Sequence, residues 1–120
     1  PLKLYAEWIY VGISGGALGL GQGDKAYIWK FYSKIENDGI SFKLLTSYNT
    51  PFKNDYSQYE HSGVQTLDVF CNRPHRVMIG DIEGFSGKMG TGSLGSEKVG
   101  LWITVPDDSI YKEAINMICE

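Results

Sequence analysis

The sequence predicts an α+β domain, an antiparallel sheet of about six strands with one C-terminal helix packed on it. Aromatic residues make up 13% of the 120 residues, and they favour pleated strands over helices. Short apolar runs alternate with clusters of turn-forming residues, which is typical of antiparallel sheets. Apolar residues at helical spacing follow Pro106. We expect residues 1–120 to form one domain.

Six segments have the composition of strands, because each is rich in β-branched or aromatic residues and has flanking turn signals. In chain order they are 4–13, 25–32, 40–48, 64–71, 75–82 and 99–105. Thr50-Pro51 ends the third strand, since proline cannot donate a hydrogen bond to a sheet. Pro106 ends the sixth.

The remaining segments predict turns and loops. Glycines concentrate in 14–23 and in 84–95. Asn37-Asp38-Gly39 predicts a tight turn, because these residues tolerate positive φ. Residues 52–63 are polar and predict an exposed excursion.

Two apolar faces are expected to cover each other. The core face of the fourth strand is predicted to be Gln65, Leu67, Val69 and Cys71, with Val64, Thr66, Asp68 and Phe70 on the other face. The helix over 108–119 has an apolar stripe of Ile110, Ala114 and Ile118, flanked by Tyr111 and Ile115. Asp107 or Asp108 can cap its N-terminus. The helix is therefore placed on the inner face of the sheet.

The two cysteines, Cys71 and Cys119, end the fourth strand and the helix. Their pairing would close a loop of about 50 residues and stabilise the fold by about 4 kcal/mol in the chain-entropy model. A disulfide would indicate an oxidising compartment. Two buried free thiols in a cytosolic protein are the alternative.

The glycine-rich patterns do not predict a nucleotide-binding site. Gly90 to Gly95 matches G-x-G-x-x-G, but a strand rather than a helix is predicted after it, so no helix N-terminus would hold a pyrophosphate. Neither His61 nor His75 has a second ligand at zinc spacing, and there is no calcium-loop pattern. We expect no metal and no cofactor.

A thiol enzyme could be argued from Cys71 and His75, but a disulfide would remove the nucleophile. No G-x-S-x-G elbow is present. The chain is therefore predicted not to be an enzyme. Its net charge of −3 has no like-charge block, so nucleic acid is not an expected partner.

Two groups of residues are candidates for binding. Arg73, His75 and Arg76, with Lys88, could form a small basic edge for an acidic partner, or simply a solvated turn. Tyr56 and Tyr59 belong to a group of aromatic residues around a predicted loop, together with Tyr48 and Phe52. Exposed tyrosines are common anchors in protein interfaces, although core packing would use the same residues.

Short motifs along the whole chain resemble the surface-adhesin protein E family, a group of small exported domains of Gram-negative bacteria. They are Trp8-Ile9-Tyr10-Val11-Gly12, Tyr27-Ile28, Ser33 to Gly39, Thr66 to Cys71, Arg76-Val77-Met78, Met89 to Gly92, Trp102, Pro106 and the terminal helix that ends in Cys119. The chain departs from the family at Trp29-Lys30 and in the glycine-rich segment 14–23.

The resemblance implies a six-stranded antiparallel sheet whose C-terminal helix is tied by a Cys71–Cys119 disulfide. It also implies export to the cell surface, outer membrane or periplasm, with a lipid anchor ahead of Pro1 as one option. The named family member binds host extracellular-matrix and plasma proteins. We therefore expect a non-catalytic domain that binds a protein partner. A periplasmic structural or accessory subunit of an envelope assembly is the alternative, and a homodimer is a further expectation.

Overall fold

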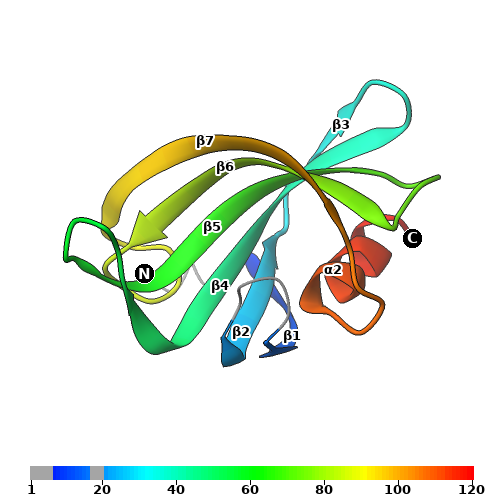
Figure 1. Ribbon diagram of the computed structural model, residues 1–120. Helices are drawn as coiled ribbons and strands as arrows, with labels where there is room; N and C mark the ends of the chain where they lie inside the picture. Colours follow the sequence, from blue (N-terminus) through cyan, green and yellow to red (C-terminus); the bar gives the residue numbers. More distant parts are fainter. Residues whose placement is uncertain (1–6, 17–20) are drawn as a thin grey trace.

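The computed structural model describes residues 7–16 and 21–120, in which an antiparallel sheet of seven strands curves around one helix (Figure 1). The elements are β1 (Trp8–Gly15), β2 (Gln22–Trp29), β3 (Ser33–Ile35), β4 (Gly39–Lys53), β5 (Tyr59–Phe70), β6 (Arg76–Phe85), β7 (Ser93–Thr104) and α2 (Ile110–Ile118). The strand order is β1-β2-β4-β5-β6-β7, with β3 paired to β4. The predicted sheet and C-terminal helix are confirmed.

The main core lies between α2 and the inner face of the sheet. All five predicted apolar residues of the helix are buried, namely Ile110, Tyr111, Ala114, Ile115 and Ile118. They pack against Ala26, Ile28, Phe42, Leu44, Leu67, Val69 and Val77. Leu67 and Val69 are fully buried, as the alternation in the fourth strand predicted. The Tyr111 hydroxyl donates a hydrogen bond of 2.8 Å to Gln65 Oε1 and so marks the edge of this core.

A second, smaller core lies on the opposite face of the sheet. Leu45, Val64 and Phe85 are buried there, with Trp8, Tyr27 and Met89 packed against them. Val64 points away from the main core, as the alternation predicted, but it is buried all the same because the loop after β6 folds back and covers it. Ser62 holds that loop, since its hydroxyl donates to the Gly87 carbonyl and accepts from the Gly90 amide.

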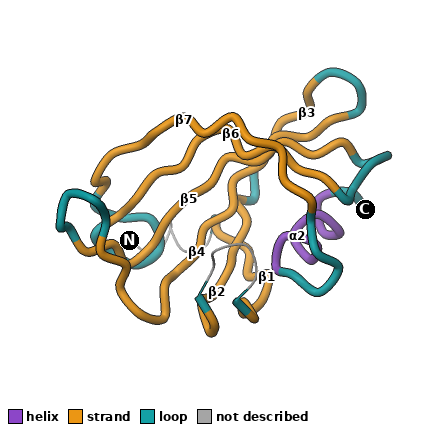
Figure 2. The backbone as a smooth tube through the Cα atoms, in the orientation of Figure 1, coloured by secondary structure: helices purple, strands orange, loops and turns teal. Residues whose placement is uncertain are grey.

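The predicted excursion at 52–63 and the predicted stop at Thr50-Pro51 were wrong. β4 continues through Pro51 to Lys53, and β5 begins at Tyr59. A register shift between Ser47 and Phe52 lets the strand pass the proline, because a residue in an irregular stretch need not donate to the ladder. The result is one long hairpin (Figure 2).

Other boundaries differ by a few residues. The predicted loop 84–95 is shorter in the structure, because β6 runs to Phe85 and β7 starts at Ser93, which leaves residues 86–92 as the loop. β3 was not predicted, although Asn37 and Asp38 form the expected turn with φ of 61° and 60°. Ser109, not Asp107 or Asp108, caps α2, because its hydroxyl accepts from the Lys112 amide at 3.2 Å. Residues 4–6 of the first predicted strand and 17–20 of the first turn lie outside the described residues.

The predicted disulfide joins Cys71 to Cys119, with 48 residues of sequence separation and a Cα–Cα distance of 5.5 Å. Cys71 follows the end of β5, and Cys119 is the C-cap residue of α2. The bond therefore ties the last turn of the only helix in the described residues to the sheet that it covers. The alternative of two free thiols is excluded by this pairing.

Replacing both cysteines, Cys71→Ser with Cys119→Ser, is expected to lower the free energy of unfolding by about 2–4 kcal/mol, since the unfolded chain loses a cross-link. Urea denaturation followed by circular dichroism measures the change. Wild-type protein in reducing buffer is the control and should unfold at the same urea concentration as the double variant. Equal stability of the oxidised wild type and the variant would contradict the structural role of the bond.

Candidate binding surfaces

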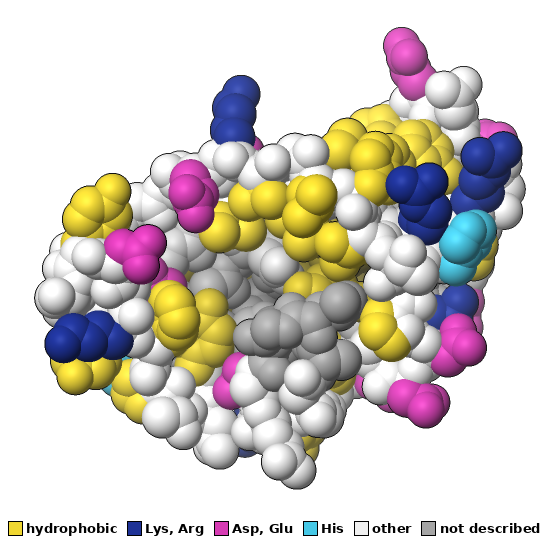
Figure 3. All heavy atoms as spheres, viewed as in Figure 1, with side chains coloured by type: hydrophobic (Ala, Val, Ile, Leu, Met, Phe, Trp, Pro, Cys, Tyr) yellow, Lys and Arg dark blue, Asp and Glu magenta, His cyan; other side chains and the backbone are white. Residues whose placement is uncertain are grey.

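The inner face of the sheet has a groove of about 900 Å³ beyond the end of α2. It is lined by the start of β2, the second half of β4, the hairpin turn, and the facing parts of β5, β6 and β7. Figure 3 shows the molecule hollowed at the centre of the face that it presents. A volume of this size is in the range of pockets that hold ligands.

The floor of the groove is a row of residues with little or no side chain. Thr46 pairs with Gly63, Gly63 with Gly84, and Gly84 with Gly95. A Cβ atom at Gly63 would collide with the Tyr48 hydroxyl, and one at Gly84 would collide with the carboxylate of Glu60. The glycines therefore let these two side chains lie flat on the sheet, where larger residues would fill the groove.

Carboxylates surround this floor. Asp24 is 4% exposed, and its oxygens accept hydrogen bonds from the Gly21 and Asn49 amides at 2.8 and 2.7 Å. Glu60 accepts a hydrogen bond of 3.1 Å from the Asn54 side chain. Glu97 and Asp55 line the groove and are exposed.

Burial and the negative charges of Glu60 and Asp24 affect the pKa of Tyr48. Burial, followed by the negative charges of Glu60 and Asp24, raises the pKa of the Tyr48 phenol to about 12. Burial also raises the pKa of Tyr111, and the hydrogen bond to Gln65 lowers it by a smaller amount. The groove is thus an electronegative site in which a phenol stays protonated.

The tip of the β4–β5 hairpin carries the predicted residues Tyr56 and Tyr59, which are 84% and 57% exposed. The tip has a fixed shape, because the Asn54 amide donates to the Gln58 carbonyl and the Asn54 side-chain oxygen accepts from the Tyr56 and Gln58 amides. Core packing, the other interpretation of these tyrosines, does not use them. Phe52 is exposed as well, whereas Tyr48 lies in the groove.

The predicted basic edge is only partly assembled. Arg73 and His75 are exposed in the turn after β5, and the Arg76 guanidinium lies 5.1 Å from the centre of the Trp102 ring. Lys88 lies in the loop at the other end of β6 and does not join them.

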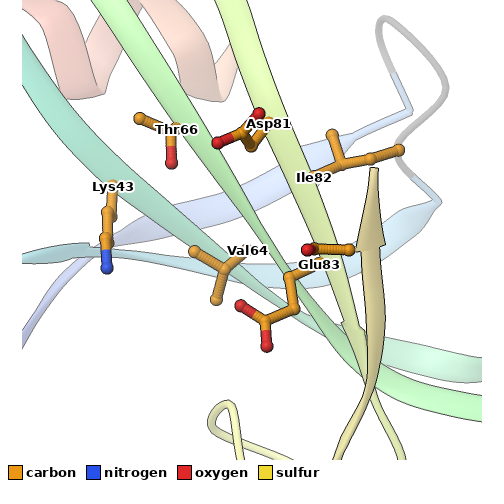
Figure 4. Close-up of a pocket in the computed structure, with 7 residues that line it drawn as sticks. Lys43, Val64, Thr66, Asp81, Ile82 and Glu83 are labelled. Atoms are coloured by element: carbon orange, nitrogen blue, oxygen red, sulfur yellow. The ribbon is translucent and has the colours of Figure 1, made fainter. Parts of the chain in front are cut away.

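A small pocket of about 250 Å³ opens on the outer face of the sheet. Lys43, Thr66 and Glu83 line it from three neighbouring strands (Figure 4). Strand alternation places Lys43 and Thr66 on the face of Leu45 and Val64, opposite α2. Among residues 7–16 and 21–120, no nitrogen of Lys43 is within 4.0 Å of a carboxylate. Its groups do not converge on one point where a reaction could occur.

Within the described ranges, no three His, Cys, Asp or Glu side chains are grouped so that they could hold a metal ion. In the same part of the chain no helix has the length and apolarity needed to cross a membrane.

Solved structures with the same fold include those of Haemophilus influenzae protein E. One crystal form matches with a TM-score of 0.67 at 12% identity, covering 92% of this chain and 86% of that one. The structure from non-typeable H. influenzae matches with a TM-score of 0.65 at 12% identity, covering 95% and 76%. At this identity the likeness shows the fold. No curated protein matches the chain significantly.

The family described as surface-adhesin protein E matches residues 17–120. The chain belongs to this family. The motif at Trp8-Ile9-Tyr10-Val11-Gly12, from which the resemblance was partly drawn, precedes the matched residues. The other motifs fall within them.

Membership in the surface-adhesin protein E family decides the class of function. The chain is a non-catalytic surface-adhesin domain that is exported to the cell surface. The disulfide agrees with export, since such bonds persist in oxidising environments. A structural subunit of an envelope assembly is not favoured by this family.

Sequence reasoning missed the groove. Gly63, Gly84 and Gly95 lie in segments predicted as excursion and loop, so their alignment across three strands was not visible. Glycines inside strands signal close approach of another group, but only the register shows that these three lie side by side.

The raised pKa of Tyr48 predicts a loss of stability at high pH. The phenol ionises near pH 10 in the unfolded chain and near 12 in the folded one. Its contribution to the free energy of unfolding is therefore complete below pH 10 and is lost as the pH rises to 12, by at most about 2.7 kcal/mol.

Urea denaturation at pH 9 and pH 11 measures this loss. Tyr48→Phe should lose less stability than the wild type between these two pH values, while the exposed Tyr56→Phe control should lose as much as the wild type. Identical pH dependence of the Tyr48→Phe variant and the wild type would contradict the assignment.

Proposed function

We propose that this domain binds an extracellular-matrix or plasma protein of a host, and that it does so from the outer face of the outer membrane. The hairpin tip with Tyr56 and Tyr59 carries the proposal. Among the described residues, Tyr56 is the most exposed of the large hydrophobic side chains.

Exposed tyrosines on a rigid turn suit protein recognition. A phenol ring covers a large area and loses little conformational entropy on binding. Because Asn54 already holds the turn, little ordering of the backbone would be needed. The ammonium of Lys53 lies 5.9 Å from the centre of the Tyr59 ring and limits the freedom of that side chain.

Arg73, His75 and Arg76 are proposed as a secondary contact for acidic groups of the partner. Arg76 is supported by Trp102, which in turn stacks on Phe70 at 6.0 Å between ring centres. A guanidinium held on an aromatic face is better ordered than a free one. Lys88 would act separately, near the hairpin end of the sheet.

A second copy of the chain is a further proposed partner, along the edge of the sheet formed by β1. Ile9, Tyr10 and Ile13 of this edge strand are 43%, 50% and 58% exposed. β1 holds no charged residue, and charged side chains are a usual protection of edge strands against pairing.

Binding to immobilised laminin and vitronectin tests the proposed function, with surface plasmon resonance as the measurement. The double variant Tyr56→Ala with Tyr59→Ala is expected to bind at least about tenfold more weakly, since central aromatic anchors dominate interface energies. Tyr32→Ala is the matched control, because Tyr32 is 49% exposed and lies outside the hairpin.

The control should bind like the wild type. If neither host protein is retained by the wild type, or if the hairpin variant and the control bind alike, the proposal is overturned.

A further inference from the structure

The groove on the inner face is lined by both polar and apolar residues, unlike the apolar core beneath α2. Along β5 the residues that face α2 change from Val69 and Leu67, which are fully buried, to Gln65 and then Gly63. Along β4 they change from Leu44 to Thr46 and Tyr48. The apolar residues end where α2 ends, and no helix of residues 7–16 and 21–120 covers this half of the sheet.

The charge of the groove has one sign. Its acidic lining residues are Asp24, Asp55, Glu60, Glu83 and Glu97, and none of the described residues that line it is Lys, Arg or His. Glu83 also lines the outer pocket, where its carboxylate accepts from Ser93 at 2.6 Å. In the described part of the chain, none of these carboxylates has a basic nitrogen within 4.0 Å.

Aromatic surface accompanies this charge. Tyr48, Phe52 and Tyr56 line the groove together with the carboxylates, and Tyr48 and Phe52 lie 6.4 Å apart between ring centres. Lysine and arginine side chains bind both kinds of group, carboxylates through charged hydrogen bonds and aromatic faces through cation–π contacts.

We propose that the groove binds an extended segment of a partner protein that is rich in lysine or arginine. The inference rests on the proposed function, because it names the chemistry of the host segment that this domain would recognise.

The size of the groove fits a short extended segment. It reaches from β2 to β7 across four strand spacings, which is about 19 Å along the sheet. An extended chain advances about 3.3 Å per residue, so about six residues would cross it. Glu60 and Glu97 lie on different strands along this path and can hold two separate basic side chains.

The carboxylates differ in their roles. Asp24 has both oxygens engaged by backbone amides and supplies a fixed negative charge at the β2 end. Glu60 receives one bond from Asn54 and keeps acceptor capacity for a ligand. Glu97 is exposed and free to turn toward one.

Fluorescence anisotropy with labelled hexapeptides tests the proposal. An Arg-Gly repeat should bind the wild-type domain, a Glu-Gly repeat should not, and binding should weaken as salt is raised. The variant Glu60→Gln with Glu97→Gln should bind the Arg-Gly peptide at least about fivefold more weakly, because two charged contacts are lost.

The matched control is Glu36→Gln with Glu120→Gln, which removes the same charge from exposed residues outside the groove. It should bind like the wild type, and circular dichroism should show that both variants are folded. If both double variants bound the Arg-Gly peptide equally more weakly, the loss of binding would be caused by net charge alone, and the proposal would be overturned. So would equal binding of the acidic peptide, or binding of neutral oligosaccharides in place of the basic peptide.

The host-protein assay separates the two proposals. If laminin or vitronectin binds through Tyr56 and Tyr59 while the basic peptide does not bind, this inference fails and the proposed function stands. If the peptide binds through Glu60 and Glu97 while no host protein is retained, the proposed function fails.

Discussion

The packing of one short helix against a much longer curved sheet governs this structure. α2 has nine residues, whereas β4 has fifteen and β5 has twelve, so the helix buries only one end of the inner face. The apolar residues of the sheet follow this limit, because Phe42, Leu44, Leu67 and Val69 lie under the helix. The Cys71–Cys119 bond holds the last turn of the helix at that position. The open end of the same face becomes the groove.

The outer face is stabilised by different means. No helix in the described residues covers it, and the loop after β6 supplies Met89 instead, over Leu45, Val64 and Phe85. The fully buried hydroxyl of Ser62 joins this loop to β5 through hydrogen bonds of 2.6 and 3.0 Å. The sheet therefore has a core on each face, and the two cores are displaced from one another. Each core covers only part of its own face, and a groove or pocket lies on the rest of that face.

A small basic turn and the acidic groove lie at opposite ends of the sheet. Arg73, His75 and Arg76 lie in the turn between β5 and β6, while the acidic groove and the aromatic hairpin tip lie at the far ends of the same strands. A net charge of only −3 conceals this separation. An adhesin domain with such a distribution presents surfaces of opposite character to its partners, so that the orientation of the domain decides which surface meets the host.

The sequence by itself determined the antiparallel sheet and the apolar stripe of α2, because both depend on local periodicity. Its two cysteines allowed either a disulfide or free thiols, and the structure decided for the disulfide. Sequence motifs also indicated the family. Tertiary structure alone decided the hairpin through Pro51, the burial of Val64 and the groove. These depend on register, on a loop folding back over a strand, and on three glycines far apart in the chain becoming neighbours. Long-range pairing, which no local pattern encodes, produced the surface most suited to binding.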